Sequence, residues 1–181
     1  ALAFWVLAPI LLSKAVAIRP KAVHLLLGVL VLVPTQLAMV SLRGESPDLL
    51  LAVVGIVVIA DSAAYFAGRR FGKHKLAPSI SPGKTWEGAI GAWLAITVYG
   101  VALHFLSPGT CGFQCLPQVL AAFWVLFGLS VLGDLFESSL KRQAGIKDSG
   151  NLLPGHGGVL DRIDSLTAVL PAAALFWMWL K

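Results

Sequence analysis

Six stretches of this sequence are mostly apolar and long enough, or nearly so, to cross a bilayer as helices, which takes about 20 residues. They are residues 2–18, 22–41, 48–68, 87–106, 117–136 and 163–180. Of the 181 residues, 57% are hydrophobic and 13% are charged, whereas soluble domains carry about 25% charged residues. A soluble domain of this size has one core and cannot bury so much apolar surface. We therefore predict an all-α, polytopic integral membrane protein with about six transmembrane helices, forming a single membrane domain over residues 1–181.

The basic residues are distributed unevenly between the connecting loops. Eleven of the 14 lie in the loops that follow the first, third and fifth stretches, whereas the opposite side holds only Arg43 and Lys181. Because basic residues are enriched on the cytoplasmic side of membrane proteins, the two long polar loops, 69–86 and 137–162, are predicted to be cytoplasmic, with both chain ends facing outward. The net charge of +5 then suits anionic lipid or a phosphorylated substrate better than nucleic acid.

Seven of the nine acidic residues gather at or just below this predicted cytoplasmic boundary. Asp134 ends the fifth apolar stretch and shares one helix face with Glu137, Ser138 and Lys141, which follow it at i+3, i+4 and i+7.

Asp161 and Asp164 share one helix face at the start of the sixth stretch. The two helix ends could bring the carboxylates of Asp134, Asp161 and Asp164 together. Carboxylate oxygens together with water are the ligands that Mg²⁺ prefers, so these three residues are candidate metal ligands. From the residues alone, ion pairs with neighbouring Lys and Arg explain the same carboxylates equally well.

A glycine-rich loop, residues 147–158, precedes the last apolar stretch and reads KDSGNLLPGHGG. Its glycines let backbone N–H groups approach an anion closely, and the helix start that follows adds partial positive charge. The basic residues beside it are Lys141, Arg142, Lys147 and Arg162. Together they predict a phosphate site, although a glycine-rich loop is often only a turn, His156 can be an ordinary turn residue, and Lys141 and Arg142 can simply extend to the membrane surface.

The first long loop contains Gly83-Lys84-Thr85, which matches the end of a P-loop. We exclude a P-loop because the glycine that the motif requires five residues earlier is Pro78, and because no strand is expected before it. Lys84 at the foot of a helix remains a candidate point-charge contact to phosphate.

The segment from Ser138 to Asp164 resembles the signature of phosphatidate cytidylyltransferases, the CDP-diacylglycerol synthases. The match runs without a gap over 27 residues and comprises SSLKR, KD, G, LP, HGG and DRID in that order. Two earlier stretches also resemble the bacterial members, namely DSAAY at 61–65 with the glycines that follow it, and residues 81–88. Bacterial members have further membrane spans ahead of the region that corresponds to Ala1, so the chain is similar to the C-terminal portion of such an enzyme.

The resemblance implies a Mg²⁺-dependent nucleotidyl transfer in which CTP and phosphatidic acid give CDP-diacylglycerol and pyrophosphate, a step of phospholipid biosynthesis. The implied catalytic residues are Asp134, Lys141, Arg142, Asp161 and Asp164, of which the three aspartates are the metal ligands. The implied substrate-binding residues are Ser81, Lys84, Lys147, His156, Gly157, Gly158 and Arg162. Asp61 would have a supporting or structural role.

The same resemblance implies a bacterial inner (cytoplasmic) membrane location with the active site facing the cytoplasm. The expected partners are CTP, phosphatidic acid and membrane lipid, with no nucleic acid, and a homodimer is left open. Two other functions fit parts of the pattern. A CTP-dependent lipid or polyprenol kinase would share the nucleotide and the setting, and a cation or proton transporter would also carry buried carboxylates. Against a transporter, the acids cluster at one face of the membrane and do not continue through it.

Overall fold

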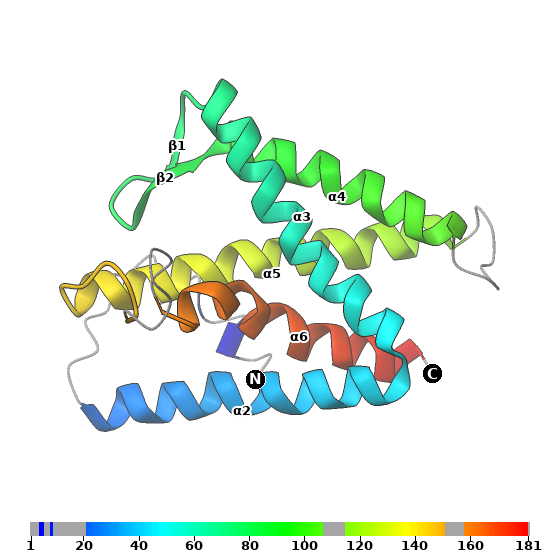
Figure 1. Ribbon diagram of the computed structural model, residues 1–181, viewed down its shortest axis with the longest axis horizontal. Helices are drawn as coiled ribbons and strands as arrows, with labels where there is room; N and C mark the ends of the chain where they lie inside the picture. The colour runs from blue at the N-terminus through cyan, green and yellow to red at the C-terminus, as the bar shows by residue number, and fades with distance from the viewer. Residues whose placement is uncertain (1–3, 6–7, 9–20, 107–114, 151–157, 181) are drawn as a thin grey trace.

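The computed structural model describes the whole chain except residues 1–3, 6–7, 9–20, 107–114, 151–157 and 181. Within the described residues, long helices follow one another along the chain, with one short β-hairpin between the second and third of them (Figure 1). In order, they are α2 (Lys21–Glu45), α3 (Pro47–Phe71), β1 (Lys75–Ala77), β2 (Ser81–Thr85), α4 (Trp86–Leu106), α5 (Leu116–Gln143) and α6 (Leu160–Leu180). The predicted first stretch, 2–18, lies almost entirely outside the described residues.

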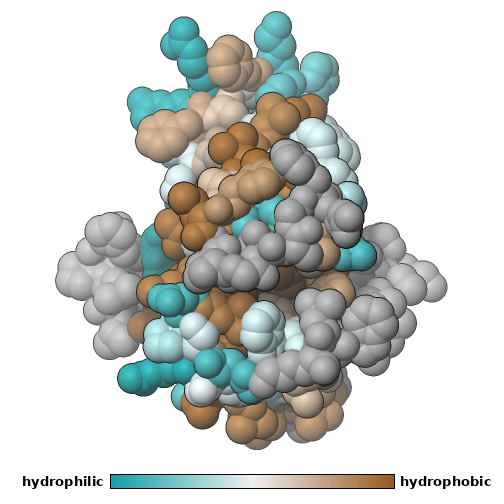
Figure 2. Space-filling view, turned by 90° about the vertical axis from the view of Figure 1, so that its right-hand side faces the viewer, coloured by the Kyte–Doolittle hydropathy of each residue, from teal (hydrophilic) through white to brown (hydrophobic). Residues whose placement is uncertain are grey.

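Four of these helices are long and apolar enough to cross a membrane, namely α2 from Leu25 onward, α3, α4 and α5. They confirm the second to fifth predicted stretches. Large apolar side chains such as Leu37 and Val98 are 65% and 69% exposed on their surfaces, and Figure 2 shows brown apolar side chains on the face turned to the viewer. Such a surface is suited to lipid. Helix α6 covers the sixth stretch but is not among the four, so six transmembrane helices remain a prediction.

The connection between α3 and α4 differs from the sequence-based expectation of an unstructured loop. Strands β1 and β2 pair antiparallel with Lys75 opposite Thr85 and Ala77 opposite Ser81, and Trp86 N donates to the His74 carbonyl at 3.0 Å. The expectation that no strand precedes Gly83 was therefore wrong. The strands are only 3 and 5 residues long, and neither shows the alternation of apolar and polar residues by which a strand is recognised in sequence.

Helix α5 continues beyond the predicted end of its apolar stretch at residue 136 and ends at Gln143. The predicted polar loop that begins at 137 is therefore helical in its first two turns. This extension places Asp134, Glu137, Ser138 and Lys141 on one continuous helix, as their spacing predicted.

Glycines allow the helices that carry the polar residues to pack closely. A Cβ added at Gly91 of α4 would lie 2.4 Å from the Ala67 Cβ of α3, and one at Gly133 of α5 would lie 2.9 Å from the Asp164 carbonyl oxygen of α6. Small residues at such crossings let membrane helices approach closely. Because Gly133 precedes Asp134, the α5–α6 contact brings Asp134 near Asp164.

The polar connections gather at one end of the helix bundle. In Figure 1 the β1–β2 hairpin, the C-terminal end of α5 and the N-terminal end of α6 all lie toward the left of the view. This arrangement agrees with the prediction that both long polar loops share one side of the membrane. That this side is the cytoplasmic one remains a prediction.

Candidate active site

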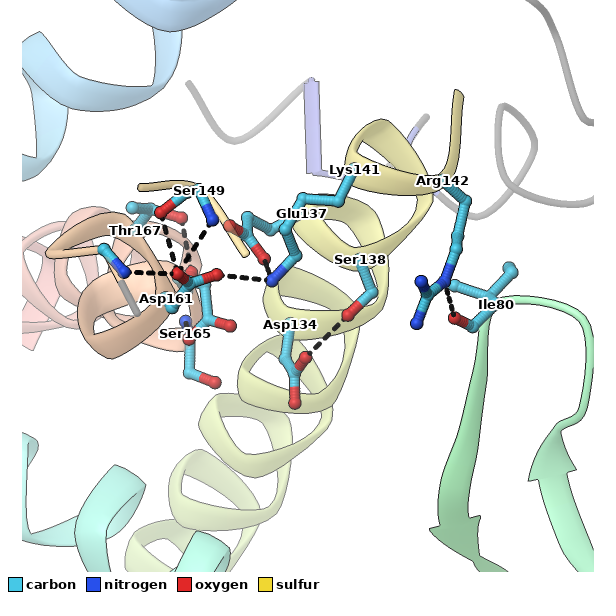
Figure 3. Close-up of polar contacts among 12 residues, drawn as sticks. Ile80, Asp134, Glu137, Ser138, Lys141, Arg142, Ser149, Asp161, Ser165 and Thr167 are labelled. Atoms are coloured by element: carbon cyan, nitrogen blue, oxygen red, sulfur yellow. Dashed lines mark hydrogen bonds and ion pairs between the residues drawn. The ribbon is translucent and has the colours of Figure 1, made fainter. Parts of the chain in front are cut away.

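The last turns of α5 present a row of polar side chains at this end of the bundle. Ser138 Oγ donates to Asp134 Oδ1 at 3.1 Å, one helical turn apart (Figure 3). Lys141 is ion-paired with Glu137 in the same i, i+4 relation. Glu137 is 7% exposed, and a buried carboxylate of this kind requires a compensating charge, which the Lys141 ammonium supplies.

Lys141 also connects α5 with the start of α6. Its Nζ lies 2.6 Å from Asp161 Oδ1, while Asp161 Oδ2 accepts hydrogen bonds from Ser149 N and Ser149 Oγ at 2.9 Å and from Gly158 N at 2.7 Å (Figure 3). Charge-assisted bonds of this kind are about twice as strong as neutral ones. Asp161 therefore joins both ends of the glycine-rich loop to the two helices that flank it.

A cavity of about 380 Å³ opens between α3, α4, α5 and the hairpin. Its polar lining includes Asp61 from α3, Ser81 and Lys84 from β2, and Asp134 from α5, and small apolar residues form much of the remainder. Lys84 is ion-paired with Asp134 across the cavity. A cavity of this size with a few converging polar groups is typical of a site for a small ligand.

A second cavity, of about 180 Å³, lies on the other side of α5 against α2 and α6. Glu137 and Asp164 are its acidic residues, and apolar side chains such as Leu27 and Phe136 form most of its wall. Asp164 Oδ1 accepts from Ser165 N at 2.7 Å. Because the Asp164 backbone packs against Gly133, Asp164 lies near Asp134 across the α5–α6 contact, and the like charges of the two carboxylates repel.

The predicted metal ligands differ in how well they fit a divalent cation. Asp134 and Asp164 repel each other and also Asp61, and Mg²⁺ bound between such carboxylates would relieve that repulsion. Asp161 has both oxygens occupied by Lys141 and by Ser149 and Gly158. Asp134 likewise has both oxygens occupied, by Ser138 and Lys84, so each of the two would have to release a partner. Within the described residues, no three His, Cys, Asp or Glu side chains are already arranged around one point. Asp164, whose Oδ1 accepts one backbone N–H, thus fits a metal most readily, and Asp134 and Asp161 fit one after releasing a cationic partner.

The structure places the remaining predicted residues as follows. Arg142 Nε donates to the Ile80 carbonyl of the hairpin turn at 3.3 Å (Figure 3). Lys147 and Arg162 are exposed beside the glycine-rich loop, and Gly158 is buried. His156 and Gly157 lie outside the described residues. Of the predicted phosphate-binding residues that the structure describes, Ser81 and Lys84 line the first cavity, whereas Lys147, Gly158 and Arg162 are not among its lining residues.

Two residues of the site were not assigned to it from sequence. Glu137 precedes Lys141 by four residues, and this i, i+4 spacing is the sequence signal that could have indicated their ion pair. Ser149 contacts Asp161 by both its N–H and its hydroxyl. No sequence signal indicated that contact, because it depends on the path of the loop.

Within the described residues, four helices are apolar enough to cross a membrane and a cavity with charged side chains opens among them, and comparison with known proteins identifies the family. Residues 1–180 match the cytidylyltransferase family. The chain is 46% identical over 188 residues to the phosphatidate cytidylyltransferase of Pseudomonas aeruginosa, which covers 98% of this chain and 67% of that protein. It is 49% identical over 132 residues to the phosphatidate cytidylyltransferase of Haemophilus influenzae, covering 72% of this chain and 46% of that protein.

A protein of the same name from Staphylococcus aureus is 40% identical over 136 residues, which cover 71% of this chain and 48% of that protein. The chain thus matches two thirds of the length of the Pseudomonas protein and about half the length of the other two. The chain belongs to the cytidylyltransferase family.

Proposed function

We propose that the protein transfers the cytidylyl group of CTP to phosphatidic acid, giving CDP-diacylglycerol and pyrophosphate. The observation that carries this proposal is family membership over residues 1–180, with relatives named phosphatidate cytidylyltransferase. In the reaction, a phosphate oxygen of the lipid forms a bond to the α-phosphorus of CTP. The bond from that phosphorus to the bridging oxygen breaks, and pyrophosphate leaves. The product enters phospholipid biosynthesis.

The side chains of the site supply what this reaction needs. The lipid phosphate is already an oxyanion, so the reaction depends on holding the reactants in place and on neutralising negative charge rather than on a strong base. Lys84 on the first cavity is suited to the nucleotide phosphates, and Lys141 is held rigidly between Glu137 and Asp161. Ser81, Lys147, His156, Gly157, Gly158 and Arg162 remain predicted substrate contacts.

We further propose that Mg²⁺ is the cofactor and that Asp134 and Asp164 hold it, with Asp161 as a predicted third ligand. When bound, Mg²⁺ would neutralise charge on the reacting phosphates. The support from the structure is that the close contact of Gly133 with Asp164 brings the Asp134 and Asp164 carboxylates near one another, a juxtaposition of like charges that a divalent cation would offset. Assembly as a homodimer remains open.

The setting that we propose is the bacterial inner membrane, with the charged end of the bundle facing the cytoplasm. A site at that boundary lets a soluble nucleotide meet a lipid that stays in the leaflet. The support is that the hairpin and the ends of α5 and α6 share one end of the bundle (Figure 1), together with the concentration of basic residues there.

Product analysis tests the proposed reaction. Membranes containing the protein are incubated with phosphatidic acid and CTP labelled either at the α- or at the γ-phosphate. We expect α-label in a liponucleotide and γ-label in pyrophosphate. Transfer of the γ-label to the lipid would instead indicate a CTP-dependent kinase, and no transfer of either label would contradict both enzymes.

Cysteine labelling tests the orientation. Added Cβ atoms at Gly83 in the hairpin and at Gly44 near the end of α2 meet nothing within 4 Å, so both positions accept a cysteine. In a background with Cys111 and Cys115 replaced by serine, we expect Gly83→Cys to react with an impermeant maleimide only from the cytoplasmic side. Gly44→Cys, the matched control at the other end of the bundle, should react only from outside. The reverse pattern would overturn the orientation.

Arg142→Lys tests the predicted contact of Arg142 with lipid phosphate. The substitution keeps the charge but loses the planar fork that binds two oxygens, so we expect the rate at low phosphatidic acid to fall about tenfold. Initial rates across phosphatidic acid concentrations provide the measurement, with expression level as the control for insertion. Unchanged rates and apparent affinity would remove Arg142 from the lipid site and leave its bond to Ile80 as a structural contact.

A further inference from the structure

Asp61 is an acidic residue within the membrane-spanning helix α3 that the proposed reaction does not use. It lines the first cavity together with Lys84 and Asp134. Within the described part of the chain, no hydrogen bond reaches its carboxylate. A carboxylate at this depth normally has a partner or a function, so its position in the cavity requires an explanation.

Lys84 is the cationic residue that lines the same cavity as Asp61. Asp61 lines the same cavity as Lys84 and Asp134, so its carboxylate attracts the Lys84 ammonium and is repelled by Asp134. Lys84 forms its direct ion pair with Asp134. The lysine comes from the short strand β2, whereas the two acids come from α3 and α5. Carboxylates on two different helices thus attract the Lys84 ammonium toward the cavity.

Asp134 and Asp61 have different roles in the proposed reaction. This inference rests on that proposed function. Once Asp134 binds a divalent cation, it can no longer serve as the main partner of Lys84. A lysine on a flexible four-carbon stem, 25% exposed in its side chain, would then be free to turn toward water. Asp61 is the other acidic residue that lines this cavity.

We propose that Asp61 is a positioning residue that keeps the Lys84 ammonium directed into the nucleotide cavity when Asp134 is engaged by another cation. Asp61 would act through Lys84 and touch neither substrate nor metal. Its loss should therefore weaken CTP binding and have little effect on the chemical step. The same loss should be without effect once Lys84 is absent.

A double-mutant cycle tests this dependence. In the full protein, we expect Asp61→Asn to raise the KM for CTP about fivefold, the size expected for a partly exposed charge pair, with kcat changed less than twofold. In a Lys84→Met background, Asp61→Asn should change KM by less than twofold. Asp48→Asn, the same substitution at the start of α3, about 20 Å away along the helix, is the matched control.

Each other outcome of the cycle overturns the proposal. Independent, multiplying effects of the two substitutions would show that Asp61 does not act through Lys84. A shifted Mg²⁺ concentration for half-maximal activity in Asp61→Asn would make Asp61 a cation ligand. A lower KM would make it a source of repulsion toward the nucleotide.

A second measurement does not depend on catalysis and so separates this inference from the proposed function. An amine-acylating reagent reaches a lysine whose ammonium is turned toward water more readily than one whose ammonium is directed into the cavity. Asp134→Asn mimics the loss of the ion pair. We expect Lys84 to be acylated about fivefold faster in Asp134→Asn/Asp61→Asn than in Asp134→Asn, as measured by mass spectrometry of its peptide. Exposed Lys75 on β1 should react equally in both proteins. Equal rates at Lys84 would overturn the proposal, whether or not the protein turns over CTP.

Discussion

Asp134→Asn is expected to lower the rate of liponucleotide formation about 10³-fold while leaving membrane insertion intact. Asp134 contacts residues from several elements of the site. It pairs with Lys84 of β2, accepts a hydrogen bond from Ser138 Oγ at 3.1 Å, and lies near Asp164 across the α5–α6 contact. Losing a charged metal ligand costs several kcal/mol of transition-state stabilisation, and about 4 kcal/mol corresponds to 10³ in rate.

Rates for Asp134→Asn are measured at saturating Mg²⁺, with the amount of inserted protein as reference. Asp148→Asn is the matched control, since Asp148 is exposed in the glycine-rich loop and is expected to keep most of the activity. A rate for Asp134→Asn within tenfold of the wild type would remove Asp134 from the metal site.

Asp161→Asn is the second substitution with a large expected effect, about 10²-fold or more in rate. The carboxylate ties Lys141 of α5 to Ser149 and Gly158 of the loop. An asparagine loses the charge that strengthens all of these bonds, and breaking one member of a buried charge pair costs about 3–5 kcal/mol. Ser149 and Gly158 should then lose their fixed positions beside the start of α6.

Two measurements separate a loop-holding role of Asp161 from its predicted role as a metal ligand. If Asp161 mainly holds the loop, Asp161→Asn should become more sensitive to limited proteolysis within residues 144–159, and extra Mg²⁺ should not restore its rate. Ser149→Ala, which removes only the hydroxyl contact, should show a smaller defect of the same kind. Restoration by Mg²⁺ with unchanged proteolysis would assign Asp161 to the metal.

The local part of the site could be predicted from sequence because helical spacing alone determines it. The i, i+4 relations on α5 predicted that Ser138 would lie beside Asp134 and Lys141 beside Glu137, and both contacts are present. The apolar stretches likewise predicted α2 to α5 as candidate membrane helices. In these cases the residues that matter are separated by one turn or belong to one continuous apolar run.

The long-range part of the site could not be predicted in the same way. The bond from Lys141 to Asp161 joins residues 20 positions apart on two different helices. The pair of Lys84 with Asp134 depends on a hairpin too short and too polar to be recognised in sequence. Family resemblance indicated which of these residues matter but not their contacts. Asp161 illustrates the difference, since it was predicted as a metal ligand and is held in the structure by a lysine and by loop N–H groups.

Pyrophosphate release is the most direct test of the central claim that the Asp134 cavity performs cytidylyl transfer to lipid. Membranes containing the wild-type protein or Asp134→Asn are supplied with CTP and Mg²⁺, with and without phosphatidic acid, and pyrophosphate and liponucleotide are both quantified. We predict one pyrophosphate per liponucleotide in the wild type, release only when phosphatidic acid is present, and almost none with Asp134→Asn. Pyrophosphate release without phosphatidic acid, or equal release by both proteins, would contradict the claim.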